Sequence, residues 1–156
     1  MFARIISSRS SYLSLPNFKS NLLVRNMSSA RKVISTTNAP AALGPYSQAI
    51  VANGMVFVSG QIPINPATGQ IDAQDISGQT EQALKNLEAI LEASGSSIAN
   101  VVKTTCFLDD IKEWPAMNDV YARVFHTNPP ARSAFEVAKL PKDAKVEIEA
   151  IAKLNE

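Results

Sequence analysis

The chain has 156 residues, of which 46% are hydrophobic and 19% charged, with a net charge of +1, an ordinary composition for one globular domain. This composition excludes a wholly disordered, a collagen-like and a disulfide-scaffold protein. The single cysteine, Cys106, cannot form an internal disulfide, and the single histidine, His126, excludes zinc sites built from several His and Cys ligands.

The first 32 residues differ from the rest of the chain in charge. They carry six basic residues and eight serines but no acidic residue, whereas residues 33–156 hold nine basic and fourteen acidic residues, a net charge of −5. An Arg- and Ser-rich segment without acids is typical of organelle transit peptides. We therefore predict a mitochondrial transit peptide and flexible linker over 1–32 and a matrix location. A plastid address and an unselected extension are the alternatives.

Short β-type segments follow the N-terminal segment. The pattern predicts strands over 34–36, 47–52 and 55–59, and no apolar run is long enough to span a membrane. Asn53-Gly54 predicts a tight hairpin turn, because both central positions of such a turn need positive φ. A further turn is predicted over 65–69.

The middle of the chain predicts helix, strand and helix in that order. Apolar spacing predicts a helix over 76–94, with Asp75 as its N-cap and Gly95 as the left-handed residue after its end. A β-branched run predicts a strand over 101–108, and a second apolar stripe predicts a helix over 113–126. Two last strands are predicted near 131–138 and 145–152.

This order predicts an α+β fold in which a mixed β-sheet carries two helices on one face. Alternation places Val102 with Thr104, Cys106 and Leu108 on one side of the 101–108 strand, and Val101 with Phe107 on the other. Because both sides are partly apolar, we expect the helix-free face to pack against other copies of the chain in a closed homo-oligomer.

Two charged side chains could act together on a small anion. Alternation puts Arg132 and Ala134 on one face of their strand and Glu147 and Glu149 on one face of theirs. If the two strands are neighbours, a guanidinium fork for a carboxylate and a base for water come together. A structural ion pair is the simpler interpretation of such residues, and alternation does not separate Glu147 from Glu149.

Three other polar residues have simple structural interpretations. Cys106 is predicted to be a buried core thiol, and His126 to be a cation in the last turn of a helix, with no triad partner. Tyr46, in Gly44-Pro45-Tyr46, fits either a turn residue packed on the core or a functional residue.

Five segments carry a more specific signal: Asn38–Gln48, Val58–Pro63, Val101–Thr105, Pro130–Ser133 and Val146–Ala150. In this order and spacing they resemble the Rid family, the YjgF-like reactive intermediate deaminases. The resemblance extends over about 120 residues of the predicted domain, 33–156. It implies a chorismate-mutase-like fold, a homotrimer around a central β-barrel, and sites in the clefts between subunits.

The resemblance also implies an activity. Family members hydrolyse the enamine and imine products of pyridoxal-phosphate-dependent dehydratases, 2-iminobutanoate and 2-iminopropanoate, to 2-keto acids and ammonia. They thereby protect pyridoxal-phosphate enzymes from damage, and they use no cofactor and no metal.

Site residues follow from the resemblance position by position. It implies that Arg132 binds the substrate carboxylate, that Glu147 holds or deprotonates the attacking water, and that Tyr46 hydrogen-bonds near the imine. The residues implied to shape the pocket or contact substrate are Ser59, Gly60, Asn118 and, through its main chain, Ala134. Position 134 is often cysteine in this family, so any thiol-based regulation there is lost.

Two other functions are compatible with the resemblance: a non-catalytic metabolite-binding or holdase module, and an RNA-acting translation inhibitor or ribonuclease. The −5 charge of residues 33–156 is unfavourable for phosphate binding, so we expect no nucleic-acid partner and no membrane partner. The segment from Met27 resembles the start of family members without a presequence, which predicts a minor cytosolic form beginning at Met27.

Overall fold

The computed structural model describes residues 30–156. Most of the predicted transit peptide and the predicted second start at Met27 therefore lie outside the described residues. The strands are β1 Lys32–Ile34, β2 Ala49–Ala52, β3 Met55–Gln61, β4 Val101–Leu108, β5 Ala131–Glu136 and β6 Val146–Lys153, and the helices are α1 Ile76–Ala93 and α2 Trp114–Val124.

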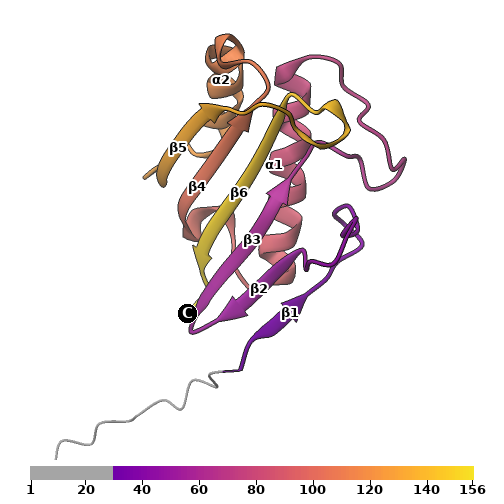
Figure 1. Ribbon diagram of the computed structural model, residues 1–156. Coiled ribbons are helices and arrows are strands. Elements are labelled where there is room, and N and C mark those ends of the chain that lie inside the picture. Colours follow the sequence, from indigo (N-terminus) through magenta and orange to yellow (C-terminus); the bar gives the residue numbers. More distant parts are fainter. Residues whose placement is uncertain (1–29) are drawn as a thin grey trace, which may run out of the picture.

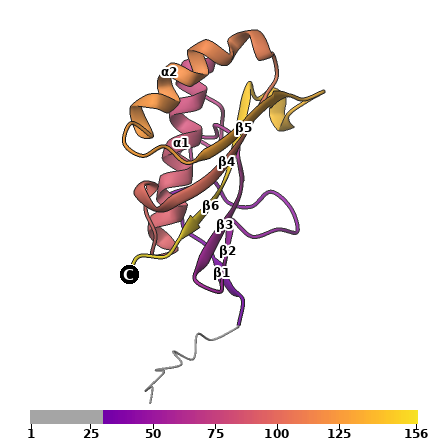
Figure 2. The same ribbon diagram turned by 90° about the vertical axis from the view of Figure 1, so that its left-hand side faces the viewer.

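One mixed sheet and two helices make up the fold. The six strands lie in the order β1-β2-β3-β6-β4-β5 (Figure 1). In the perpendicular view both helices lie on the same side of the sheet (Figure 2). This confirms the predicted α+β class and the placement of both helices on one face.

Local signals explain the first three strands. The β2–β3 hairpin turns at Asn53 and Gly54, whose φ angles of 50° and 76° confirm the predicted tight turn. The first strand is β1, ending at Ile34, and the prediction of a strand over 34–36 was wrong in its position. The side chain of Gln48 bonds both backbone groups of Thr36 and so replaces the strand partner there.

The core lies between the helices and the sheet. Helix α1 begins at the predicted cap, where Asp75 accepts a hydrogen bond of 2.9 Å from the backbone N–H of Gly78, and Gly95 follows its end with a φ of 80°. The largest wholly buried apolar side chains are those of Leu87, Ile90, Leu91, Leu108, Met117 and Ile148.

Strand β6 corrects one prediction about the site. The chain's last strand lies between β3 and β4, so β5 pairs only with β4, in parallel. The strands that carry Arg132 and Glu147 are therefore not neighbours, and β4 separates them.

A register shift corrects a second prediction. The β4–β6 pairing slips between Val101 and Lys103, so Val101 is 7% exposed and faces the core, whereas Val102 is 41% exposed. The prediction had placed Val102 with Thr104 and Cys106, because simple alternation takes no account of a bulge.

The helix-free face of the sheet is partly apolar, as expected. Phe57 and Phe135 are 45% and 46% exposed, and the rings of Phe107 and Phe135 meet edge to face with centroids 5.3 Å apart. Residues 30–156 thus leave about half of Phe57 and of Phe135 exposed on this face. The expected homo-oligomer remains a prediction that this face supports.

Candidate active site

The predicted site residues fall into two groups in one protomer. Asn118, Arg132 and Ala134 form the Arg132 cluster, at the sheet edge formed by β5 and beside α2. Tyr46, Ser59, Gly60 and Glu147 form the Glu147 cluster, around the end of β3. The structure brings the residues within each cluster together but does not bring the two clusters together.

The two clusters lie on opposite sides of the sheet. Register pairs Arg132 with Thr104, whose side chain is wholly buried on the helix side. Glu147 is paired with Phe107 and alternates with the buried Val146 and Ile148, so its side chain lies on the helix-free face. One protomer alone therefore cannot present both charged groups to one small ligand.

Arg132 is held by uncharged partners. One of its terminal N–H groups donates to Oδ1 of Asn118 at 2.8 Å, and its guanidinium carbon lies 4.4 Å from the ring centroid of Tyr121. Among residues 30–156 no carboxylate lies within ion-pair distance of it. A guanidinium has five N–H donors, so most of this fork remains for an anion.

Space for a ligand lies next to this guanidinium. A pocket of about 420 Å³ is lined by Asn118, Tyr121, Phe125, Pro130 and Arg132, among others. Strand β5 is an edge strand, so part of its backbone, in the stretch that holds Ala134, points away from β4 and can bond a ligand. The Arg132 cluster therefore combines a cation, an apolar wall and free main-chain groups.

Glu147 has the environment of a proton acceptor. Burial, and to a lesser extent the neighbouring Glu149, raise the pKa of the Glu147 carboxyl above its ordinary value. Glu149 is exposed on the same face. The raised pKa gives a physical reason to prefer Glu147 over Glu149 as a candidate base. Alternation alone could not separate the two residues.

Gly60 leaves room for that carboxyl group. A Cβ atom built on Gly60 would overlap the Glu147 carboxyl, so no larger residue fits there while Glu147 keeps its place. The β3–β6 register shifts between Val58 and Gln61, which opens the strand at Ser59 and Gly60.

Tyr46 lies on a loop beside Ser59 and Gly60. Its ring is 50% exposed, and its hydroxyl oxygen accepts a hydrogen bond of 3.2 Å from the backbone N–H of Leu43. The Ser59 hydroxyl donates to the carbonyl oxygen of Ser47 at 2.7 Å, which ties β3 to the residue after Tyr46. Tyr46 is thus accessible and does not pack in the core.

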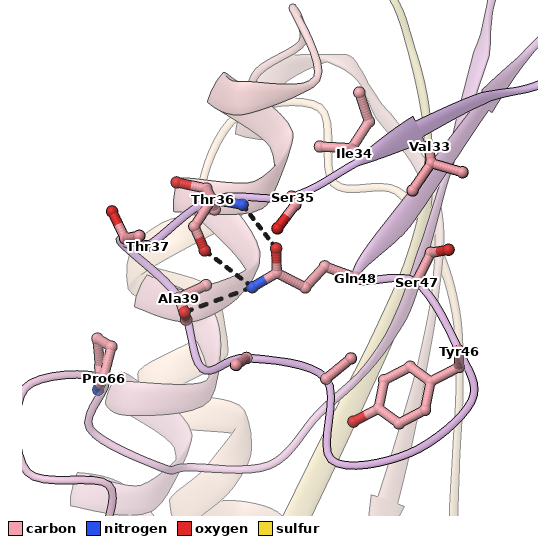
Figure 3. Close-up of a pocket in the computed structure, with 12 residues that line it drawn as sticks. Val33, Ile34, Ser35, Thr36, Thr37, Ala39, Tyr46, Ser47, Gln48 and Pro66 are labelled. Atoms are coloured by element: carbon pink, nitrogen blue, oxygen red, sulfur yellow. Dashed lines mark hydrogen bonds between the residues drawn. The ribbon is translucent and has the colours of Figure 1, made fainter.

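Gln48 fixes the loop that carries Tyr46, and sequence reasoning assigned it no role. Gln48 is 4% exposed, and its side chain accepts from the N–H of Thr36 at 2.7 Å and donates to the carbonyls of Thr36 and Ala39 (Figure 3). It also donates to the carbonyl of Pro40 at 2.7 Å. Beside it, and bordered by Tyr46, lies a pocket of about 480 Å³ with no charged lining residue.

The interpretation of Cys106 as a buried core thiol is confirmed, whereas the placement of His126 in the last turn of a helix was wrong, because α2 ends before it. Cys106 is wholly buried, and burial raises the pKa of its thiol to about 11, so it is not a thiolate at neutral pH. His126 is exposed and lies just beyond α2, which ends at Val124. No group of His, Cys, Asp and Glu within residues 30–156 is arranged to hold a metal ion.

Two residues beside the Arg132 cluster were not predicted as part of the site. Tyr121 lies in the helix predicted over 113–126, and Thr104 was placed on one side of the 101–108 strand, but sequence reasoning gave neither of them a role in the site. The spacing of Asn118 and Tyr121, three apart on α2, was an available signal, because such residues lie side by side on a helix.

Within the part of the chain that the structure describes, no helix is both long and apolar enough to cross a membrane.

Comparisons with known proteins place the chain in a family. The profile of the Endoribonuclease L-PSP family matches residues 36–154. Reactive Intermediate Deaminase A, chloroplastic, from Arabidopsis thaliana is 50% identical over 139 residues, which cover 89% of this chain and 74% of that protein.

A human relative and a solved bacterial structure are also similar. The Homo sapiens protein named 2-iminobutanoate/2-iminopropanoate deaminase is 47% identical over 122 residues, covering 78% of this chain and 89% of the relative. The crystal structure of Escherichia coli TdcF with bound serine has a TM-score of 0.76 and 44% identity, covering 80% of this chain and 99% of TdcF.

Proposed function

The chain belongs to the Endoribonuclease L-PSP family, which includes the YjgF and Rid proteins, and we propose that it hydrolyses small 2-imino acids to 2-keto acids and ammonia. The observation that carries the proposal is the state of Arg132. This partly buried cation is oriented by Asn118 and Tyr121 and lacks a carboxylate partner in residues 30–156. The carboxylate of a small ligand would supply the ion-pair partner that Arg132 lacks.

The proposed substrates are 2-iminobutanoate and 2-iminopropanoate, and the names of the human and Arabidopsis relatives support this choice. The pocket of about 420 Å³ beside Arg132 suits a small molecule with a short aliphatic tail, because Phe125 and Pro130 form apolar walls. Removing such reactive imines would protect pyridoxal-phosphate enzymes, and the reaction needs no cofactor or metal.

The reaction begins with binding of the substrate carboxylate by the Arg132 fork, which lysine cannot reproduce. The Glu147 carboxylate takes a proton from a water molecule, and the water oxygen attacks the electrophilic imine carbon. Glu147 then gives this proton to the imine nitrogen, which leaves a tetrahedral carbinolamine. As the carbon–nitrogen bond breaks, the carbinolamine hydroxyl passes its proton through Glu147 to the departing nitrogen, so ammonia and the 2-keto acid leave and Glu147 is a carboxylate again. The raised pKa of Glu147 favours both proton transfers near neutral pH.

Tyr46 and the backbone of Ala134 would orient the imine nitrogen, while Ser59 and Gly60 shape the wall around Glu147. The substrate is already electrophilic, so positioning and one proton carrier suffice. A positioned general base typically contributes about 10² to 10⁴ in rate.

Because Arg132 and Glu147 lie on opposite faces of the sheet, we propose that each site combines the Arg132 cluster of one subunit with the Glu147 cluster of its neighbour. A homotrimer in which the helix-free faces form a central barrel would supply such sites. The exposed Phe57, Val102 and Phe135 on or beside that face support the assembly.

The test couples this protein to a serine/threonine dehydratase and follows keto-acid formation above the spontaneous rate. Arg132→Lys is expected to lower kcat/KM by about 10- to 100-fold, the loss expected for a charge-assisted bidentate contact. Cys106→Ser and His126→Gln are the matched controls and are expected to retain activity. Full activity in Arg132→Lys would overturn the proposed site.

The alternatives differ in what this assay shows. A metabolite-binding or holdase module would bind keto acids without accelerating imine hydrolysis. An RNA-acting protein would bind RNA with an affinity that falls steeply as salt rises and depends on particular Lys or Arg residues. The family takes its name from an endoribonuclease, but residues 33–156 carry a net charge of −5, which is unfavourable for binding RNA.

For location we propose the mitochondrial matrix, supported by the basic, Ser-rich and acid-free composition of residues 1–32. The chloroplastic relative in Arabidopsis keeps the plastid as the alternative. Residues 1–32 fused to a fluorescent protein are expected to direct it to mitochondria. Detection of a single N-terminus in both organelle and cytosol would contradict the second start at Met27.

A further inference from the structure

The Arg132 guanidinium lies over the aromatic ring of Tyr121. The guanidinium carbon lies 4.4 Å from the Tyr121 ring centroid and 5.6 Å from the ring of Trp114, within the range of cation–π attraction. Asn118, one turn earlier on α2, accepts a hydrogen bond from the same group. Three side chains from one helical segment thus fix the position and the plane of the guanidinium.

The Tyr121 ring is itself fixed. Its hydroxyl oxygen lies 2.7 Å from Oγ1 of Thr104, and the two residues are 4% and 0% exposed. Phe125 packs against the ring with a centroid distance of 4.4 Å. Thr104 on β4 is the register partner of Arg132 on β5, so the residue that anchors the ring is directly beside the one that the ring supports.

A role in stability alone does not require this polar pair. Replacing both partners of a buried hydrogen bond by apolar groups of the same shape can be nearly neutral for stability. The hydroxyl pair does fix one tilt of the ring, which a phenylalanine facing a valine would not. The orientation of that ring matters directly for the cation resting on it.

We infer that Tyr121, anchored by Thr104, is a positioning residue that sets the plane of the Arg132 guanidinium so that its unbonded N–H groups meet the substrate carboxylate. The inference rests on the proposed function and deepens it, because it adds a second layer of residues to the carboxylate site. Tyr121 itself does not touch the reacting atoms.

Two variants test this inference: one removes the whole Tyr121 ring, and the other removes only the hydrogen bond between Tyr121 and Thr104. Tyr121→Leu removes the ring face, and KM for the imine and the inhibition constant of 2-oxobutanoate are both expected to rise about tenfold, with kcat changed less than about threefold. The double variant Thr104→Val/Tyr121→Phe keeps both shapes and the ring, and both constants are expected to rise only about threefold.

A matched control separates positioning from stability. Val120 lies on the same helix and is also buried, but it lines a different pocket from the one beside Arg132, so Val120→Ala should lower the melting temperature without changing either constant. A purely structural role for Tyr121 would reduce the amount of folded enzyme in the same way and leave KM unchanged.

The outcomes distinguish the inference from the proposed function. If Arg132→Lys loses activity while Tyr121→Leu keeps wild-type constants, the inference is wrong and the proposed function stands. Should Tyr121→Leu fail to fold, wild-type constants in the double variant would overturn the anchoring by Thr104. Full activity in Arg132→Lys would instead remove the proposed function on which the inference rests.

Discussion

The Arg132 cluster and the Glu147 cluster are built in different ways. Arg132 lies on a regular strand and is held by side chains of one helix, with its supporting tyrosine bonded to a neighbouring strand. Glu147 lies beside a register shift, and Tyr46 stands on a loop fixed by Gln48. The half proposed to bind the substrate anion is therefore preorganised by packing, whereas the half proposed to transfer protons depends on space left by a glycine and on a loop.

The two halves also differ in the side of the sheet that they use. Because the sheet separates the two clusters within one chain, neither cluster alone provides both of the charged groups in the proposed mechanism. Variants that alter one cluster and leave the other intact therefore test whether the two clusters act together.

The largest effect is expected when two inactive variants are combined. Arg132→Ala and Glu147→Gln should each keep about 1% or less of the activity, because each removes one essential group. Mixed subunits reassembled at equal amounts should recover about a quarter of wild-type activity, since an intact site needs an intact residue from each of two neighbours. The coupled dehydratase assay measures the recovery.

Mixing two variants of the same half is the control. Arg132→Ala and Asn118→Ala impair residues of one protomer's cluster, so their mixture should not exceed the mean of the two parents. If the Arg132→Ala and Glu147→Gln mixture also failed to exceed its parents, the two-subunit site would be wrong.

The next effect concerns the Glu147 half alone. Gly60→Ala places a methyl group where the Glu147 carboxyl lies, so kcat should fall about tenfold while the inhibition constant of 2-oxobutanoate changes little. Steady-state kinetics separate the two constants. The overlap should also lower the melting temperature of Gly60→Ala, but Gly60→Ala should not lower it in a Glu147→Ala background, where the carboxyl group is absent. If the melting temperature fell equally in both backgrounds, the overlap would not be with Glu147.

A smaller effect is expected on stability. The pKa of Glu147 is raised in the folded protein, so between the ordinary carboxyl pKa and that raised value the folded state binds more protons, and the free energy of unfolding falls as pH rises. Glu147→Gln should therefore raise the melting temperature at pH 7 and leave it unchanged at about pH 3, where both states are protonated. A lower melting temperature of the variant at pH 7 would contradict this sign.

The smallest effect is expected at Cys106, which is adjacent to Ala134 in the β4–β5 ladder. Its thiol is buried with a pKa of about 11, so a thiol reagent at pH 8 should modify it only after unfolding. Cys106→Ala should change kcat/KM less than about twofold. Rapid labelling of Cys106 in the folded protein would contradict this expectation and show that the β4–β5 region opens to solvent more often than its packing indicates.

Much of the fold could be predicted because its signals are local. The hairpin at Asn53-Gly54, the cap at Asp75 and the turn residue Gly95 each act within a few residues of themselves. The position of β6 between β3 and β4 could not be predicted, because strand order depends on pairing between distant segments. The register shift at Val101 and Lys103 likewise has no residue that marks it.

The site was predictable in part. Resemblance supplied Arg132 and Glu147, and alternation correctly grouped Glu147 with Glu149. Alternation could not show that Arg132 and Glu147 face opposite sides, because that depends on which face each strand turns toward the helices. The contacts of Tyr121 and Gln48 could not be predicted either, because their hydrogen-bond partners lie on other elements or loops of the fold.

The central place of β6 has a consequence for synthesis. Strands β3 and β4 both pair with a segment that leaves the ribosome after them, so until then each offers an open edge with unbonded amides and carbonyls. The nascent chain can form its first hairpin early but cannot close its sheet until β6 arrives. During that interval the exposed edges of β3 and β4 can pair with a strand of another chain, so the order of synthesis leaves a period in which aggregation competes with folding.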